Sequence, residues 1–171
     1  MRRRDLVRLS FAATLGAQSK TPELTPPIAG LTVKDLRDTF NERRGNGMHE
    51  AIDIISPRGT PVFAVVPGTI RKLFLSRPGG LTIYLFDKQE RFCYYYGHLD
   101  AYHQDLRQGD KVKAGELLAY VGSTGNADPR VPHLHMAIFE LGPEKKWWNG
   151  TPLNPYPLLI AAVKNQIDRR F

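Results

Sequence analysis

Two pairs of residues in this chain have the side chains and the spacing to bind a metal ion. His133 and His135 are separated by one residue, and far upstream His49 precedes Asp53 by four positions. Imidazole nitrogens and carboxylate oxygens bind zinc, and a catalytic zinc site has three protein ligands and one open position. Structural zinc sites usually have four ligands and favour cysteine, but the chain has only Cys93. The two pairs therefore predict a split metal site of the catalytic kind.

The elements that position these residues are predicted to be strands. Side chains alternate between the two faces of a strand, so residues two or four apart point the same way. Both pairs fit this spacing, although His49 and Asp53 would also fit a helix. The isoleucines in the range 52–55 are β-branched, and Ser-Pro-Arg-Gly at 56–59 supplies turn residues directly afterwards. We therefore expect a strand that includes His49 and Asp53.

Glu50 is a further carboxylate beside this predicted site. The segment from His49 to Asp53 superficially resembles the His-Glu-x-x-His motif of helical zinc peptidases, in which the glutamate is the general base. On a strand, Glu50 points away from a metal that His49 and Asp53 face. We therefore expect a structural or surface role for Glu50.

His98 and His133 are candidates for acid and base chemistry. His98 follows the aromatic, strand-like run at 91–96, and His133 shares a predicted strand with His135. Zinc lowers the pKa of bound water, but attack on an amide still needs a proton acceptor and a group that stabilises the oxyanion. Imidazoles can do both near neutral pH. Cys93 lies in the same run, where we expect a buried, inert thiol.

Five motifs in a fixed order carry a family resemblance. They are His49-x-x-x-Asp53, the segment Gly-Thr-Pro-Val-Phe-Ala-Val-Val-Pro-Gly-Thr-Ile at 59–70, Tyr96-Gly97-His98-Leu99, Gly122-Ser123-Thr124-Gly125 and Pro132-His133-Leu134-His135. With this set the chain resembles the lysostaphin/LytM-type zinc metallopeptidases, which cleave peptide bonds in bacterial peptidoglycan. Each motif alone is weak, whereas the ordered set is specific.

The resemblance implies a role for each of these site residues. Zinc would be bound by His49, Asp53 and His135, while His98 and His133 would lie beside the metal-bound water. Some members of the family have lost ligands and act only as binding or activating modules, but no ligand is lost here. The fifth histidine, His103, lies outside every motif and is expected at the surface.

Two departures from the family pattern concern the surroundings of the site. The family commonly has His-x-Gly-x-Asp, whereas this chain has Ala51, which adds only a methyl group. The segment 125–132 before His133 is longer than the usual serine and glycine link. Because loops carry specificity, this segment is expected to alter the groove and the substrate preference.

The remaining sequence predicts one all-β domain, with a mainly antiparallel β-sheet metallopeptidase core, a substrate groove, a short N-terminal arm and a C-terminal helix. A chain of 171 residues with 42% hydrophobic residues can bury one core and is too short for two ordinary domains. The helix is expected at 158–167. Besides the strand at Asp53, the predicted strands are 62–66, 69–75, 81–86, 92–99, 117–121 and 133–141.

The first residues differ in kind from this domain. Residues 1–8 are basic and residues 9–17 are small and apolar, so 1–17 resembles an export signal, with paired arginines typical of a twin-arginine signal. An amphipathic or frayed N-terminal helix is the alternative. Residues 18–32 are predicted to form an extended, proline-rich arm, and 33–171 the metallopeptidase domain. Export would place the protein in the periplasm or outside the cell.

Charge and composition restrict the partners. The net charge of +7 suits an anionic polymer, but no nucleic-acid motif accompanies it, so nucleic acid is not an expected partner. No apolar run reaches the 18 residues that a membrane span needs, so stable membrane insertion is not expected. The protein is expected to be a monomer. Arg43, Arg44 and the Lys-Lys-Trp-Trp run at 145–148 could form a basic rim. Trp147 and Trp148 could stack on sugar rings or simply pack at the domain edge.

The sequence therefore predicts a zinc-dependent endopeptidase that hydrolyses the peptide cross-links of bacterial peptidoglycan. In this prediction a metal-activated water attacks the peptide bond. One alternative is a non-catalytic module of the same type that binds the cell wall or activates an amidase. Another is a metallopeptidase that acts on proteins or peptides outside the wall.

Overall fold

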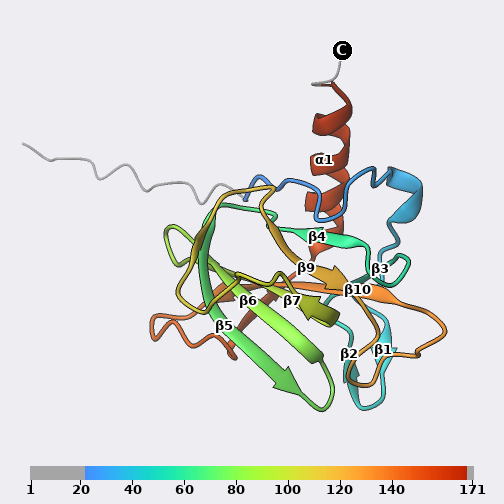
Figure 1. The fold of residues 1–171 in the computed structure, drawn as a ribbon, viewed down its shortest axis with the longest axis horizontal. Helices are drawn as coiled ribbons and strands as arrows, with labels where there is room; N and C mark the ends of the chain where they lie inside the picture. The colour runs from blue at the N-terminus through green and yellow to red at the C-terminus, as the bar shows by residue number, and fades with distance from the viewer. Residues whose placement is uncertain (1–21, 169–171) are drawn as a thin grey trace, which may run out of the picture.

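A mostly antiparallel β-sheet and one C-terminal helix make up the protein in a computed structural model that describes residues 22–168 (Figure 1). The predicted export signal at 1–17 and the first residues of the predicted arm lie outside the described residues. The predicted fold class is confirmed. The elements are η1 (Val33–Asp35), β1 (Arg43–Arg44), β2 (Gly47–Met48), β3 (Ile52–Ile55), β4 (Pro61–Phe63), β5 (Gly68–Ser76), β6 (Gly80–Asp87), β7 (Phe92–Tyr102), β8 (Lys111–Val112), β9 (Leu117–Val121), β10 (His133–Leu141), β11 (Gly150–Leu153) and α1 (Pro155–Asp168).

The strand order brings distant parts of the sequence together at β10. Within residues 22–168, nine strands form one sheet whose main path is β11-β10-β7-β6-β5-β8. β10 pairs with β7 along one edge, and with β3 and β11 along the other. β9 pairs with β7 and β4. The segments that contain Asp53, His98 and His135 are therefore neighbours in the sheet although they are far apart in the chain.

Alternation along β10 separates the core from the predicted site. Leu134 and Met136 are fully buried, whereas His133 and His135, which alternate with them, are only half-buried. Strand geometry requires this division, because successive side chains point to opposite faces. Burial of each large apolar side chain contributes roughly 1.5–3 kcal/mol, so the hydrophobic residues fix which face the histidines occupy.

The arm and the helix complete the core away from the site. Leu24 and Ile28 of the arm are buried, and the Thr25 amide donates to the Val65 carbonyl at 2.8 Å. In α1, Leu159 and Val163 are buried against the same core, and Figure 1 shows the helix at the end of the molecule opposite the β5–β6 turn. Among the described residues no helix is long and apolar enough to cross a membrane.

The structure corrects several predicted boundaries. β9 and β10 have the predicted bounds, while β4 ends at Phe63 rather than at residue 66. The helix begins at Pro155, three residues before the prediction. Its start is explained by the Asn154 side chain, which accepts a hydrogen bond from the Tyr156 amide at 2.9 Å, followed by proline at the first helical position. The β1–β2 hairpin, β8 and β11 were not predicted, because two to four residues are too few to show a period.

Candidate metal centre

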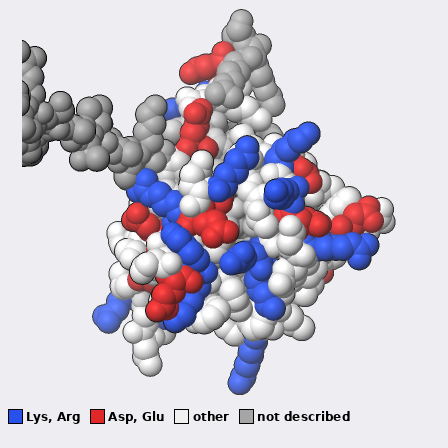
Figure 2. Space-filling model, turned by 90° about the vertical axis from the view of Figure 1, so that its left-hand side faces the viewer, with Lys and Arg blue, Asp and Glu red and all other residues white. Residues whose placement is uncertain are grey.

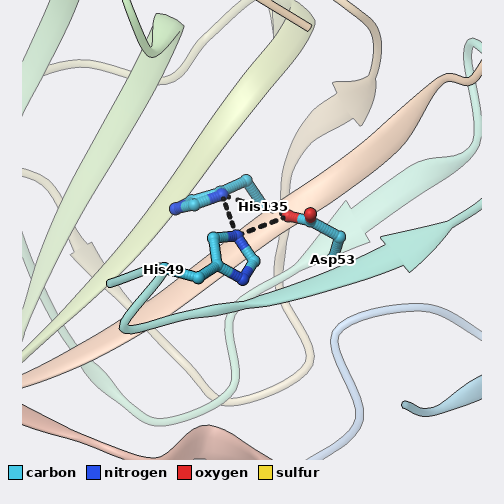
Figure 3. Close-up of side chains that lie close together, drawn as sticks. All are labelled: His49, Asp53 and His135. Carbon is cyan, nitrogen blue, oxygen red and sulfur yellow. Dashed lines mark hydrogen bonds and ion pairs between the residues drawn. The ribbon is translucent and has the colours of Figure 1, made fainter. Parts of the chain in front are cut away.

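Three side chains from separate parts of the sequence meet at one point (Figure 3). His49 Nε2 lies 3.1 Å from Asp53 Oδ1 and 3.2 Å from His135 Nδ1. The third side of the triangle, from His135 Nδ1 to Asp53 Oδ1, is 3.1 Å. These are the three residues for which the family resemblance implied zinc binding. The structure therefore brings the two predicted pairs together, and the three residues could hold a metal ion.

Strand pairing places Asp53 opposite His135. In the β3–β10 register Asp53 is the direct partner of His135, and Ile55 is the partner of His133. Directly opposed residues of an antiparallel pair point to the same face. Asp53 and His135 therefore meet because the buried residues on either side of each set the register.

His49 reaches the site in a different way from the one predicted. Residues 49–51 are not part of a strand, and Glu50 has a left-handed backbone with φ of 53°. Residues four apart in a straight strand have Cα atoms about 13 Å apart, so their side chains cannot converge on one ion. The turn at Glu50 folds His49 back toward Asp53, and the Glu50 amide is held by the Phe40 carbonyl at 2.9 Å. The predicted strand through His49 was wrong for this geometric reason.

The His49 ring is oriented by Thr39. His49 Nδ1 lies 3.0 Å from the Thr39 carbonyl oxygen. Because a carbonyl can only accept, Nδ1 carries the proton, and the lone pair of Nε2 points toward Asp53 and His135. A histidine ligand usually has its second nitrogen fixed in this way. Thr39 is itself buried and donates through its hydroxyl to the Ala51 carbonyl.

The donor set fits a tetrahedral metal such as zinc. Zinc bonds of about 2.0–2.1 Å at tetrahedral angles separate two ligand atoms by about 3.3 Å, close to the three distances found here. Burial raises the pKa of Asp53, but the close contacts with the His135 and His49 imidazoles outweigh it and hold the pKa well below its usual range. Burial also lowers the pKa of His135, although its hydrogen bond to Asp53 opposes this. The site thus favours an anionic carboxylate and a neutral imidazole, the forms that bind metals.

Arg44 is a site residue whose role the sequence did not indicate. Its Nη2 donates to Asp53 Oδ2 at 3.0 Å and to Glu42 Oε2 at 3.0 Å. The guanidinium therefore holds the carboxylate oxygen that does not face His49 and His135. Arg44, which was predicted to belong to a basic rim, in fact binds the carboxylates of Glu42 and Asp53. Nothing in the spacing of Arg44 and Asp53 signals this contact, which joins the β1–β2 hairpin to β3.

His98 is aimed at the site by an irregularity in β7. The residue has a left-handed backbone with φ of 57°, and the β6–β7 register shifts between Leu81 and Ile83, opposite this point. Such irregularities redirect a side chain beside many active sites. His98 Nδ1 donates to the Thr124 carbonyl at 2.8 Å, which leaves Nε2 without a proton. Burial lowers the pKa of His98 to about 4, although the hydrogen bond to Thr124 opposes this.

His133 lies between His98 and the carboxylate. Its ring centroid is 4.9 Å from that of His98, and its Nε2 lies 3.7 Å from Asp53 Oδ1. His133 Nδ1 donates to the Val131 carbonyl at 2.8 Å. Both remaining histidines that the sequence singled out are thus beside the donor triangle, each with Nδ1 held by a backbone carbonyl.

Two adjoining hollows open in front of the site. The larger hollow has a volume of about 680 Å³ and is lined by residues that include Asp53, His98 and His133. The smaller hollow has a volume of about 410 Å³ and is lined by residues that include Trp147 and Trp148. Residues 126–128 and Val131 border the larger hollow, so the long segment before His133 does form part of its rim. The residues common to both hollows are His49, Tyr84, Tyr95 and His135.

Apolar side chains are exposed around these hollows. Five of the eight large hydrophobic residues exposed within residues 22–168 line one hollow or the other: Met48, Ile55, Phe74, Val131 and Trp148. An exposed apolar cluster marks a binding surface more often than scattered residues do. The rim of the site is therefore suited to an extended ligand with uncharged segments.

Glu50 and His103 stand outside the cluster. Glu50 is exposed and borders the smaller hollow, but it is not one of the three residues that converge. His103 lies half-buried just after β7 and lines neither hollow, so the prediction of a plain surface residue overstated its exposure. Cys93 is fully buried, and burial raises the pKa of its thiol.

The sequence as a whole confirms the family. Residues 47–155 match the model of Peptidase family M23, and the chain belongs to this family of metallopeptidases. It is 29% identical over 152 residues to the L-Ala--D-Glu endopeptidase of Bacillus subtilis, an alignment that covers 84% of this chain and 45% of the relative. It is 26% identical over 121 residues to the peptidoglycan DD-endopeptidase ShyC of Vibrio cholerae, covering 67% of this chain and 27% of the relative. The chain thus spans less than half of the length of these relatives.

A solved structure shows the same fold. The catalytic domain of the antimicrobial peptidase lysostaphin from Staphylococcus simulans superposes with a TM-score of 0.58 at 28% identity. The match covers 81% of this chain and 90% of that domain. The superposition therefore extends over most of both chains.

Proposed function

We propose that this protein is a zinc-dependent endopeptidase that hydrolyses peptide cross-links of bacterial peptidoglycan. The observation that carries the proposal is the triangle of His49 Nε2, Asp53 Oδ1 and His135 Nδ1, each atom within 3.2 Å of the others. A triangle of this kind leaves the fourth tetrahedral position open toward the hollow, as catalytic zinc sites do. The membership in family M23 supports the same conclusion.

The three converging side chains are proposed as the zinc ligands, with Thr39 and Arg44 as the groups that hold them. Zinc bound there would lower the pKa of a water molecule and polarise a carbonyl group. Thr39 fixes the tautomer of His49, and Arg44 holds the second oxygen of Asp53. Hydrogen bonds of this kind commonly change metal affinity by about 10- to 100-fold.

His98 and His133 are proposed as the proton-transfer residues. Each donates its Nδ1 proton to a backbone carbonyl, so each presents Nε2 to the hollow as a proton acceptor. Because the pKa of His98 is lowered to about 4, this imidazole is neutral near pH 7 and ready to accept a proton from the attacking water. Return of a proton to the leaving amine completes the hydrolysis, and the two rings share these tasks with stabilisation of the oxyanion.

The substrate is proposed from the shape of the site and from the relatives. Two adjoining hollows with apolar rims suit an extended peptide that lies across the metal centre. One relative is named for cleavage at L-Ala--D-Glu and another for cleavage of peptidoglycan. These names describe different bonds, so the scissile bond depends on the groove of this chain, above all on residues 126–131.

The charge distribution favours the wall polymer over nucleic acid. On the face shown in Figure 2, basic and acidic side chains are interspersed instead of forming one basic area. Nucleic-acid binding favours a basic patch or stripe. The proposed location is the periplasm or the cell exterior, where peptidoglycan lies, with residues 1–17 as the export signal, 18–32 as an arm and 33–171 as the catalytic domain.

Digestion of purified sacculi tests this function. The protein is incubated with zinc and sacculi, and in parallel with an unstructured protein such as casein. Release of uncrosslinked muropeptides, with casein left intact, is the expected result. Cleavage of casein alone would establish a peptidase that acts outside the wall. Binding to sacculi without cleavage would establish a non-catalytic wall-binding module.

A further inference from the structure

Gly97 continues the row of site residues across the sheet. Asp53 on β3 is opposite His135 on β10, and His135 is in turn opposite Gly97 on β7. Directly opposed residues share a face, so a side chain at position 97 would stand beside the metal centre. The absence of that side chain leaves a space next to His135.

The ring of Tyr95 fills this space. A Cβ atom on Gly97 would lie 2.9 Å from Tyr95 Cε1 and 3.1 Å from Tyr95 Oη. A Cβ atom on Gly79, in the β5–β6 turn, would lie only 2.2 Å from the same hydroxyl oxygen. Two glycines on separate segments thus leave room for the ring and its hydroxyl group. Tyr95 is two residues before Gly97 on the same face, so its side chain folds over Gly97 toward the site.

The position of the Tyr95 ring is fixed by aromatic neighbours. Its centroid lies 4.9 Å from that of Tyr84 and 5.7 Å from that of His135, both in edge-to-face arrangements. Each such aromatic pair stabilises the folded protein by about 0.5–1.5 kcal/mol in addition to the contribution from buried apolar surface. The hydroxyl therefore has little freedom to move relative to His135.

The hydroxyl group is available to a ligand. Tyr95 borders both hollows, and its hydroxyl has no hydrogen-bond partner among the side chains and backbone of residues 22–168. Two other tyrosine hydroxyls of β7 have partners: that of Tyr102 donates to the Phe74 and Thr82 carbonyls, and that of Tyr96 accepts from the Val65 amide. The hydroxyl of Tyr94 has no partner either, but it is buried and borders neither hollow. A phenol hydroxyl carries its proton near neutral pH and can therefore donate a hydrogen bond to a ligand in the hollow.

We propose that the Tyr95 hydroxyl donates a hydrogen bond to the oxygen of the scissile carbonyl as that oxygen gains negative charge. The inference rests on the proposed peptidase function and adds to it a catalytic residue outside the metal ligands and the histidines. A donor held in place beforehand stabilises developing charge without the cost of reorganisation. Loss of one such donor reduces kcat by about 10²- to 10³-fold in enzymes that cleave acyl groups.

Tyr95→Phe tests the proposal, with Tyr102→Phe as the matched control. Both changes remove one hydroxyl from β7 and retain the ring. For Tyr95→Phe we expect kcat on cross-linked muropeptides to fall about 100-fold, with KM, zinc content and thermal midpoint close to wild type. Tyr102→Phe is expected to keep wild-type kcat. Wild-type kcat in Tyr95→Phe would overturn the proposal, as would a rise in KM with kcat unchanged.

A binding measurement provides a readout that does not depend on turnover. A phosphinic peptide carries a tetrahedral centre with an anionic oxygen, whereas a peptide with a non-cleavable planar bond does not. Calorimetry is expected to show that Tyr95→Phe lowers the affinity for the phosphinic peptide at least 10-fold and leaves the affinity for the planar peptide unchanged. Equal effects on both ligands, or on neither, would contradict the proposal. If the wild type cleaves no peptide, the proposed function fails, while this comparison still decides what Tyr95 does.

Discussion

Asp53 and His135 occupy directly opposite positions on β3 and β10, and their Oδ1 and Nδ1 atoms lie 3.1 Å apart. Neither strand places a metal ligand by itself. The register that buries Ile52 and Ile54 of β3 and Leu134 and Met136 of β10 also aligns the carboxylate with the imidazole. A shift of one residue would turn either side chain to the opposite face, so the hydrophobic core and the metal centre depend on the same pairing.

Replacement of Arg44 by glutamine is expected to weaken zinc binding. Arg44 holds Asp53 Oδ2 at 3.0 Å, and without it the carboxylate can rotate away from His49 and His135. We expect zinc affinity, measured by competition with a chromophoric chelator, to fall about 10-fold. Arg43→Gln is the matched control, because Arg43 is the exposed neighbour on the same hairpin. Equal affinities in the two variants would show that Arg44 does not position Asp53.

Removal of zinc is expected to leave the protein folded. The donors are held by the β3–β10 pairing, by Thr39 and by Arg44, so the site is formed before the metal binds. At a free zinc concentration of about 100 times the dissociation constant, zinc binding raises the free energy of unfolding by about 2.7 kcal/mol. Chelation should therefore lower the thermal midpoint by roughly 5–10 °C and leave the far-ultraviolet circular dichroism unchanged. Loss of the β-sheet signal on chelation would mean that zinc is needed for folding.

The two tryptophans at the smaller hollow are expected to differ. Trp147 packs against Tyr84 and Phe74, with ring centroids 4.7 and 5.3 Å away, whereas Trp148 is 63% exposed. Trp148→Ala should change the free energy of unfolding by no more than about 0.5 kcal/mol and should raise KM. Trp147→Ala should lower the free energy of unfolding, measured by chemical denaturation, by about 1–3 kcal/mol. An unchanged KM in Trp148→Ala would remove this side chain from the substrate groove.

Cys93 is expected to be unreactive in the native protein. The thiol is fully buried, and burial raises its pKa, so no thiolate forms at pH 8. The unfolded chain loses this proton near pH 9 while the folded chain retains it, so the free energy of unfolding should fall as pH rises above about 9. Reaction with a chromogenic disulfide at pH 8, with and without guanidinium, measures the first effect, and denaturant titrations at pH 8 and 10 measure the second. Rapid reaction of the native protein would contradict the burial.

The sequence predicted the parts of the site that depend on local pattern. Alternation identified β10 at its correct bounds and placed His133 and His135 on one face, and the ordered motifs pointed to the remaining ligands. These features are readable because strand periodicity and turn residues act over a few neighbouring positions.

Features that depend on contacts between distant segments could not be predicted. His49 reaches the site through a left-handed turn at Glu50, a residue type that gives no strong signal for that conformation. Arg44 of the short β1–β2 hairpin contacts Asp53 of β3 through its long side chain, nine residues along the chain. The place of Tyr95 depends on glycines of two separate segments, which become meaningful only when the register is known.

Two measurements on the purified protein decide whether this site is a catalytic zinc centre. They are the zinc content and the cleavage of cross-linked muropeptides, each compared between the wild type and His135→Ala. We expect about one zinc per chain and cleavage in the wild type. Both should be lost in the variant, which should keep the β-sheet circular dichroism of the wild type. A folded wild-type protein that binds no zinc and cleaves no cross-link would show that the protein is not a zinc endopeptidase.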